Sequence, residues 1–341
     1  MIKFISIICL LLLAVTVQAQ DPHFSQFFSS PLTLNPAFTG KFNGSWRLAV
    51  NHRDQWPTIP KAYVTTSGSI DFPILKGKLP EGDVFGIGLS GLTDASSNNA
   101  LKLNYGSLSV SYHKAIDENG FNTLGVGFQG TYASTTIDRS GLLFEDELRQ
   151  NGFQPNTSGE YLINPNLGNT QRYMDVNAGM LYSGSSNGEN NYYFGVSMYH
   201  LNRPKVSFLR NSTANSWYLA SRLTVHAGGT FPISDVAGVN LSIIHQSQNK
   251  ASETVIGGAL SLNANGDKEN PTSFYIGSWL RVNDAIIPYL GLEFSGIRFG
   301  ASYDINTSAL KAATGSRGGT EFSIIYTKRP SEYMGIPCPR F

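Results

Sequence analysis

The sequence is poor in cysteine and in charge, and it lacks a second long apolar run. Of its 341 residues only Cys9 and Cys338 are cysteines, and Cys9 lies in an N-terminal stretch that we expect to be removed. One thiol then remains, which excludes an intramolecular disulfide. Charged residues make up 14% of the chain and the formal net charge is +1, so no basic field favours nucleic acid as a partner. After the N-terminal stretch no apolar run is long enough to predict a membrane-spanning helix.

The first nineteen residues have the features of a secretory signal peptide. Lys3 precedes an apolar run over 4–15, and a small-residue cleavage motif ends at Ala19. This run is too short and wrongly flanked for a spanning helix. We therefore expect cleavage near Ala19/Gln20 and export from the cytoplasm, with an uncleaved N-terminal anchor as the alternative.

The rest of the chain is rich in aromatic residues and glycine, and it alternates with a period of two. Aromatic residues reach 12% and there are 35 glycines. Leu124, Val126 and Phe128 share one face, while the glycines between them and Gln129 share the other. Transmembrane barrel strands need this alternation because their side chains face lipid and lumen in turn. The pattern predicts an all-β, antiparallel outer-membrane barrel over 44–328, with about fourteen strands at 44–53, 62–72, 83–93, 101–115, 122–136, 173–183, 191–201, 217–231, 237–246, 253–263, 273–283, 285–294, 296–305 and 318–328.

The connections between these strands sort by length. An even strand number places both ends of a bacterial barrel on the periplasmic side and the longer loops outside. The longest connections all fall on the expected outer side: 137–172, 202–216 and 306–317. Three short links fall on the inner side, 117–120, 184–190 and 295–296, with two inner links that are longer than the rule prefers, 73–82 and 264–272.

A water-soluble β-sandwich is the main alternative fold. Sandwich strands also alternate and turn every eight to twelve residues, although a single sandwich of this length would be large. Tyrosines stand near both ends of two predicted strands, Tyr105 with Tyr112 and Tyr173 with Tyr182. Their placement favours the interfacial aromatic girdles of a membrane barrel.

Two glycine motifs match the dinucleotide fingerprint G-x-G-x-x-G without its context. They are GIGLSG at 86–91 and GVGFQG at 125–130. The fingerprint needs a helix after the strand to meet the pyrophosphate, whereas here the alternation runs straight through both motifs. We interpret these glycines as room for neighbouring lumen side chains or a bend, and we expect no cofactor.

Signals for catalysis and metal binding are weak. The six histidines lack metal-ligand spacing. Ser111 and His113 share a strand face, as the nucleophile and base of a lipid hydrolase would, but serine is abundant in this chain. The acidic triplet 145–147 lacks the spacing and glycine of an EF-hand calcium loop, so we interpret it as a solvated loop. We predict no enzyme and no metal site, with a lipid hydrolase as a minor alternative.

Three stretches together resemble one known family. They are QDPHFSQFF…NPAFTG within 20–40, NHRDQWP at 51–57, and YDINTSALKAATGSRGGTEFSIIY at 303–326 followed by CPRF at 338–341. After the signal peptide the chain is similar over nearly its whole length to the PorP/SprF family, outer-membrane proteins of the type IX secretion system of Bacteroidetes. The resemblance implies a barrel without catalysis or cofactor. Such barrels help export large proteins that carry a C-terminal sorting domain and hold them at the cell surface; some serve gliding adhesins, and PorP itself belongs to the core secretion assembly.

The segment 20–43 precedes the first strand and has neither helical nor strand periodicity. A disordered leader would be poor in aromatic residues, yet this segment is rich in phenylalanine. We expect it to enter the lumen or cap the periplasmic mouth, where its backbone polar groups meet a polar lumen rather than lipid. Asn35-Pro36 would form a turn. The predicted lumen-plug anchors are Phe24, Phe27, Phe28 and Phe38.

The sequence therefore predicts a non-enzymatic outer-membrane component of type IX secretion. Its expected partners are a secreted client with a C-terminal sorting domain, other type IX components and outer-membrane lipid. Residues 329–341 carry three prolines, which exclude a further central strand, so we expect a periplasmic tail in which Cys338 packs or cross-links to a neighbour. The alternative function is a diffusion porin or hydrophobic-solute transporter whose long loop folds inward.

Overall fold

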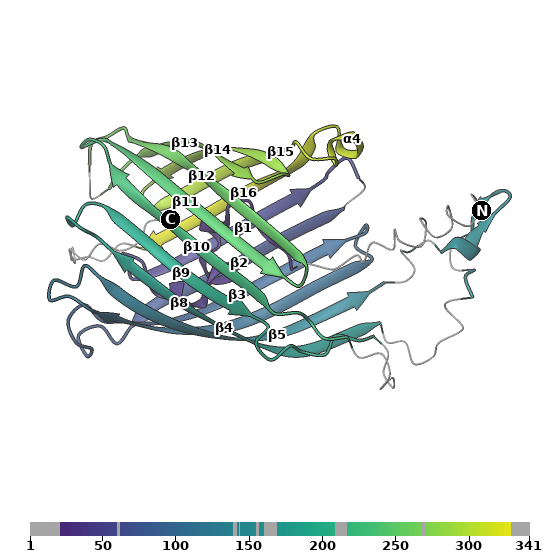
Figure 1. Ribbon diagram of the computed structural model, residues 1–341, viewed down its shortest axis with the longest axis horizontal. Helices are drawn as coiled ribbons and strands as arrows, with labels where there is room; N and C mark the ends of the chain where they lie inside the picture. Colours follow the sequence, from purple (N-terminus) through teal and green to yellow (C-terminus); the bar gives the residue numbers. More distant parts are fainter. Residues whose placement is uncertain are drawn as a thin grey trace, which may run out of the picture.

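Fourteen antiparallel strands close into one barrel in the computed structural model (Figure 1). The structure describes residues 21–59, 62–138, 142, 144–154, 157–159, 169–208, 217–267 and 270–328; the predicted signal peptide 1–19 and the predicted tail 329–341, with Cys338, lie outside them. The barrel strands are β1 (Trp46–Gln55), β2 (Tyr63–Ile74), β3 (Val84–Ser96), β4 (Leu101–Ala115), β5 (Thr123–Ile137), β8 (Thr170–Gly184), β9 (Asn191–Tyr199), β10 (Arg222–Pro232), β11 (Ala237–Gln248), β12 (Ala251–Asn263), β13 (Ser273–Arg281), β14 (Ala285–Phe294), β15 (Ile297–Asn306) and β16 (Arg317–Lys328). Each strand pairs with its neighbours in the chain, and β1 pairs with β16 to close the ring. The predicted fold class is confirmed.

Alternation along the strands separates an apolar outer face from a polar inner face. Phe128 on β5 is 57% exposed, whereas its neighbour Gln129 is 4% exposed. The burial of β5 alternates residue by residue over most of its length. An outer band of exposed apolar side chains around a polar interior is the arrangement that lipid requires.

All fourteen predicted segments correspond to barrel strands, and the largest boundary error is at β10. The sequence predicts a start at residue 217, but the strand begins at Arg222. Trp217 and Tyr218 are more than half exposed, and Tyr218 forms an isolated bridge with Lys205 in the same connection. The alternation therefore continues into a short ladder within the loop, outside the barrel wall.

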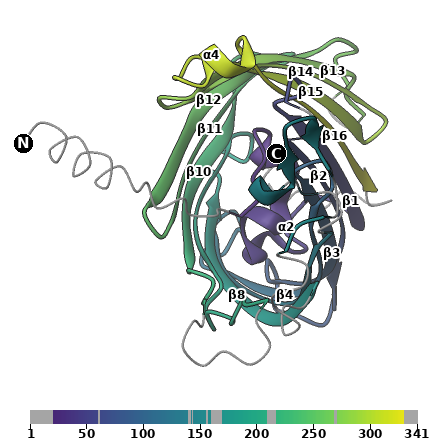
Figure 2. The same cartoon turned by 90° about the vertical axis from the view of Figure 1, so that its right-hand side faces the viewer.

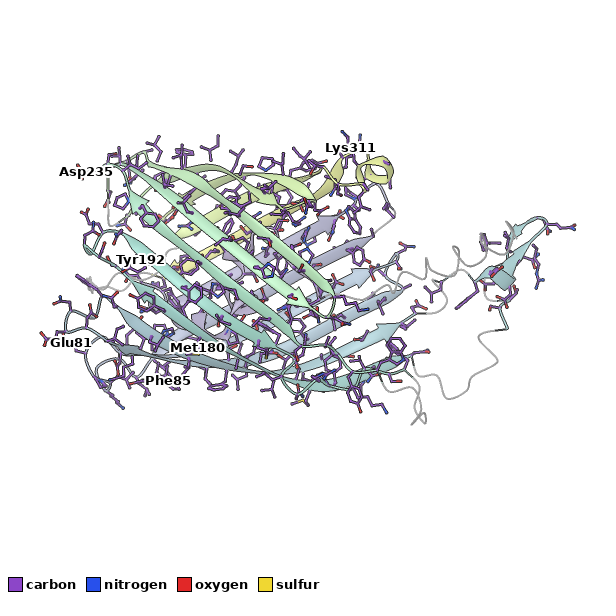
Figure 3. The ribbon with its side chains drawn as sticks, in the orientation of Figure 1. Glu81, Phe85, Met180, Tyr192, Asp235 and Lys311 are labelled. Carbon is purple, nitrogen blue, oxygen red and sulfur yellow. The ribbon has the colours of Figure 1, made fainter. Side chains whose placement is uncertain are left out.

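The two ends of the barrel differ in their connections. We call the end with the β5–β8, β9–β10 and β15–β16 connections the loop end, and the opposite end the turn end. Figure 3 shows Glu81 and Asp235 at the turn end and Lys311 at the loop end. The three connections predicted to be longest share the loop end, as the strand order requires.

Two of the four tyrosines expected in aromatic girdles face the lumen instead. Tyr105 and Tyr173 line an interior cavity, because each is two residues from a buried lumen-facing residue, Ser107 or Asp175. Strand side chains repeat their direction every second residue. The girdle prediction is therefore wrong for this pair.

The other elements of the described residues are short. β6 (Leu148–Arg149) pairs with β7 (Gly152–Phe153) in the β5–β8 connection. Five helical turns are η1 (Phe27–Ser29), α2 (Pro31–Leu34), η2 (Pro36–Phe38), η4 (Glu145–Glu147) and α4 (Lys311–Thr314). In the part of the chain that the structure describes, helices are too short or too polar to cross a membrane.

Candidate functional site: a segment within the lumen

The lumenal segment, residues 21–42, runs inside the barrel from the loop end to the turn end. Figure 2 shows it as the purple chain with α2 enclosed by the ring of strands. Asp21 lies beside Gln248 at the loop end, its amide donating to Oε1 of that glutamine at 2.9 Å. At the turn end the amide of Ser45 donates to the carbonyl oxygen of Lys328 at 2.7 Å.

Proline and asparagine give this segment its local structure. Pro31 and Pro36 stand at the starts of α2 and η2, where the missing N–H costs nothing and the fixed φ suits a helical turn. Asn35 caps η2, because its Oδ1 accepts from the amide of Ala37 at 2.9 Å. The segment is thus a series of three helical turns, and the predicted turn at Asn35-Pro36 is present.

The four phenylalanines predicted as anchors are all buried. Their exposed fractions are 6% for Phe24, 5% for Phe27, 8% for Phe28 and 0% for Phe38. The ring of Phe28 lies 4.8 Å from that of Trp279 and 5.4 Å from that of Tyr289, centroid to centroid. The ring of Phe38 lies 5.7 Å from Tyr193, edge to face. Each such aromatic pair adds about 0.5–1.5 kcal/mol beyond the area it buries.

Glycines of the two fingerprint-like motifs make room for the backbone of the lumenal segment. A Cβ added to Gly86 would lie 2.6 Å from the carbonyl carbon of Thr39, and one added to Gly127 would lie 2.6 Å from Cα of Ala37. Real Cβ atoms do not approach backbone so closely. At Gly86 and Gly127 this room is occupied by main chain of the lumenal segment, whereas at Gly125 it is occupied by the ring of His113, a neighbouring lumen side chain as predicted.

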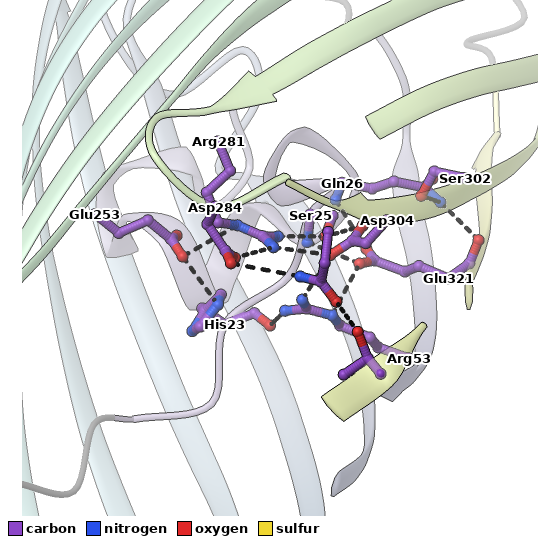
Figure 4. A network of polar contacts seen from close by, with 12 residues as sticks. His23, Ser25, Gln26, Arg53, Glu253, Arg281, Asp284, Ser302, Asp304 and Glu321 are labelled. Atoms are coloured by element: carbon purple, nitrogen blue, oxygen red, sulfur yellow. Dashed lines mark hydrogen bonds and ion pairs between the residues drawn. The ribbon is translucent and has the colours of Figure 1, made fainter. Parts of the chain in front are cut away.

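Buried carboxylates hold the segment's backbone near its start (Figure 4). The amides of Ser25 and Gln26 donate to the two oxygens of Glu321 at 2.7 and 2.9 Å. The hydroxyl of Ser25 donates to Asp304 at 2.8 Å. Nη2 of Arg53 lies 2.9 Å from Oδ2 of Asp304. One carboxylate thus satisfies two backbone donors, and the other joins the segment to the wall.

The same network continues on β12 and β13. Nη1 of Arg281 lies 2.8 Å from Asp304, and Nη2 donates to the Ser25 hydroxyl at 2.6 Å. Nε2 of His23 lies 3.0 Å from Glu253. The side chains of Arg53, Arg281 and Asp304 are almost fully buried, so each needs its partner: removing one member of a buried pair costs about 3–5 kcal/mol.

A second ionic cluster holds the segment at the loop end. His200 bridges two carboxylates, with Nε2 2.6 Å from Asp21 and Nδ1 2.8 Å from Asp175. Nη1 of Arg222 lies 3.3 Å from Asp21. Burial raises the pKa of Asp21, but Arg222 and His200 outweigh it and hold that pKa at about 2. Burial lowers the pKa of His200, but its hydrogen bonds to both carboxylates outweigh it and raise that pKa to about 9.

A bidentate ion pair fixes the other end of the segment. Arg47 on β1 reaches Asp71 on β2 through Nε at 3.0 Å and Nη2 at 2.8 Å. The same Nη2 donates to the carbonyl oxygen of Phe38 at 3.0 Å, and the amide of Gly40 donates to Asp71 at 2.7 Å. The pair thereby provides one donor and one acceptor to the segment where it leaves the lumen.

Comparison with known proteins identifies the family. The model of the type IX secretion system membrane protein PorP/SprF matches residues 16–326. The chain belongs to the PorP/SprF family. No curated protein matches the sequence. Solved structures with a similar fold include the toluene transporter TbuX of Ralstonia pickettii (10% identity, TM-score 0.49, 88% of this chain and 93% of that chain) and the toluene transporter TodX of Pseudomonas putida (9% identity, TM-score 0.47, 89% and 93%). This member of a family of type IX secretion system membrane proteins is a closed antiparallel β-barrel.

The residues that carried the weak catalytic and metal signals make structural hydrogen bonds in this PorP/SprF protein. Ser111 donates its hydroxyl to the carbonyl oxygen of Thr39 at 2.5 Å, so it supports the lumenal segment and does not bond to His113. Glu147 was expected to be solvated, but it is fully buried and accepts the amides of Phe144 and Thr157 at 3.0 and 3.2 Å. No group of three metal-ligating side chains occurs among the described residues.

Sequence reasoning missed the polar partners of the segment. Arg53, Arg281, Asp304 and Glu321 come from β1, β13, β15 and β16, and no local pattern brings them together. One signal was available: each is a charged residue on the inner face of a predicted strand, and buried charges need partners. The segment 20–43, which has no strand to pair with, was the part of the sequence that could provide hydrogen-bond partners for these buried charges.

Proposed function

We propose that this PorP/SprF barrel assists export or cell-surface anchoring of a secreted protein that carries a C-terminal sorting domain. In this proposal the barrel works without catalysis and as a closed support in the outer membrane, held shut by the lumenal segment. The client binds at the loop end, on the β5–β8 and β9–β10 connections, and other type IX components bind at the turn end.

The single observation that supports a closed support is the hydrogen bonding of the lumenal segment to the wall. Glu321 accepts two of its backbone amides, Asp304 accepts its serine hydroxyl, and Asp71 accepts the amide of Gly40. A segment held by charge-assisted bonds at both ends leaves the lumen only when several of them break together. A diffusion porin needs an open lumen, so the porin is the less favoured function.

The phenylalanines act in this proposal as anchors of the plug. Phe28 and Phe38 pack among Trp279, Tyr289 and Tyr193, so sliding the segment would expose several rings to a polar lumen at once. Deletion of residues 23–38 is the direct test. If assembly, conductance and client display were all unchanged by it, the plug would have no role.

The experiment that tests the function is affinity purification of the tagged protein from detergent-solubilised outer membrane, followed by mass spectrometry. We expect a large secreted protein with a C-terminal sorting domain, or other type IX components, to co-purify. Planar bilayers then measure conductance, which we expect to be near the background of protein-free membrane. A barrel that repeatedly purifies alone and conducts ions would contradict the proposal and favour the porin.

A further inference from the structure

Two cations on β4 and β8 point outward near the loop end of the barrel. Leu103 and Tyr173 line the interior cavity, so their neighbours Lys102 and Arg172 lie on the outer face, because the side chains of a strand alternate in direction. Both cationic side chains are exposed. They are therefore accessible to a ligand that approaches the wall from outside.

The apolar band of the outer face ends directly beside these cations. On its last rows toward the loop end it presents Leu108 on β4, Tyr132 on β5 and Met174 on β8, all at least half exposed. Beyond them, apart from Gly106, the outward positions of these three strands are polar: Lys102, Asn104, Ser134, Thr136, Thr170 and Arg172. We call these six residues the cationic patch. A membrane barrel has such a boundary where hydrocarbon meets the lipid head groups.

Strand pairing places the two cations around the hydroxyl groups of the patch. Lys102 pairs with Thr136, which pairs with Thr170, and Arg172 pairs with Ser134. The cations are two strands and two residues apart, so their Cα atoms are separated by roughly 12 Å. The Oγ1 atoms of Thr136 and Thr170 are 3.3 Å apart between them. Two long charged side chains and several hydroxyl groups can therefore contact one ligand together.

The protein does not neutralise the cations of this patch. Within the described part of the chain, neither Lys102 nor Arg172 forms an ion pair. Lys114, which points outward on β4 at the turn end, instead lies 4.0 Å from Asp83. Strands β9 to β14 contain no lysine, and their arginines, Arg222 and Arg281, form ion pairs in the lumen. The cationic patch therefore distinguishes its side of the barrel from the side that β9–β14 form.

An anion attached to an apolar body fits this patch best. A guanidinium binds phosphate through paired N–H donors, and an ammonium binds it as a point charge. The hydroxyl and amide groups between the two cations supply further donors. A soluble anion would contact only these polar groups, whereas a lipid phosphate also brings acyl chains onto Leu108, Tyr132 and Met174. Charge and apolar surface together favour the lipid.

We propose that the cationic patch binds the head group of one phosphate-bearing lipid, whose acyl chains lie on the apolar wall beside it. Two separate cations suit a head group with two separate phosphates, one on Lys102 and one on Arg172. The even strand number predicts that the loop end faces outward, which puts this lipid in the outer leaflet. The site is independent of the client that the barrel is proposed to serve.

The test uses the full-length protein in an uncharged detergent, with native mass spectrometry to measure bound lipid. The probes are diphosphoryl lipid A, its dephosphorylated form and inorganic phosphate. We expect diphosphoryl lipid A to bind, the dephosphorylated lipid to bind about tenfold more weakly or worse, and inorganic phosphate at equal concentration not to displace the lipid. Lys102→Gln and Arg172→Gln should each reduce affinity about tenfold. Arg172→Lys keeps the charge and should retain most of the affinity.

Lys114→Gln is the matched control, because this lysine is 65% exposed on the same strand and face but lies at the turn end, and it should leave affinity unchanged. Heat-modifiable gel migration would establish that every variant forms the barrel. Four results would each overturn the proposal: the lipid does not bind, the double variant of Lys102 and Arg172 binds it as the unaltered protein does, the dephosphorylated lipid binds equally well, or inorganic phosphate displaces the lipid at equal concentration. A loss in Lys114→Gln as large as that in Lys102→Gln would also contradict a site at the loop end.

Discussion

A methyl group at Gly127 would collide with the backbone of the lumenal segment. The added Cβ would lie 2.6 Å from Cα of Ala37, about 1 Å inside the usual carbon–carbon contact of ~3.5–4.0 Å. β5 is hydrogen-bonded to a strand on each side, so the segment must give way. Overpacking of this kind costs about 1–3 kcal/mol, which lowers the docking equilibrium roughly 5- to 150-fold.

Hydrogen–deuterium exchange of residues 24–40 measures this equilibrium. In Gly127→Ala we expect these amides to exchange faster by that factor while the strand amides keep their protection. Gly130→Ala is the control in the same strand, because nothing lies within 4 Å of the added Cβ. Equal protection of the segment in both variants would refute the argument that Gly127 accommodates it.

Three further changes test how the segment is held. Gln26→Ala removes three side-chain hydrogen bonds, so exchange of the segment should rise about 100-fold at roughly 1 kcal/mol each, with exposed Gln154→Ala as the control that leaves it unchanged. Phe38→Ala should weaken docking by about 3–5 kcal/mol and appear in planar bilayers as frequent openings; a silent variant would argue against an anchoring role. The pKa of His200 is raised from 6.5 to about 9 and that of Asp21 lowered from 3.8 to about 2. The histidine's contribution is therefore complete below pH 6.5 and lost as pH rises through 9, by about 3 kcal/mol, while the carboxylate's is complete above pH 3.8 and lost as pH falls through 2. Exchange at the start of the segment, corrected for its intrinsic pH dependence, should show the alkaline loss, and His200→Asn should abolish it.

The barrel was predictable from sequence because its determinants are local. Alternation with a period of two is visible within each strand, and it predicted every barrel strand to within a few residues. The burial of Phe24 and Phe38 was also predictable, since a segment so rich in aromatic residues needs an apolar environment. Tyr105 is two residues from Ser107, so alternation alone predicts that its side chain faces the lumen. Its place near the end of a strand favoured a girdle instead.

The partners of the lumenal segment were not predictable because they depend on closure of the ring. Ser25 meets Asp304 and Gln26 meets Glu321 only when β16 has returned to β1. Such contacts follow from the number and register of strands, and no single segment of sequence encodes them.

The bonds between the start and the end of the chain also order the events of assembly. Gln26 is made early, yet its side chain bonds to Ser323, 297 positions later. The polar groups of this phenylalanine-rich segment therefore lack their partners on β16 until the rest of the polypeptide has crossed the periplasm and inserted. A chain that ends before β16 lacks the acceptors for the amides of Ser25 and Gln26. Docking of the segment in the lumen therefore reports that β16 is in place. A truncated chain would instead leave an undocked, aromatic-rich peptide open to proteases.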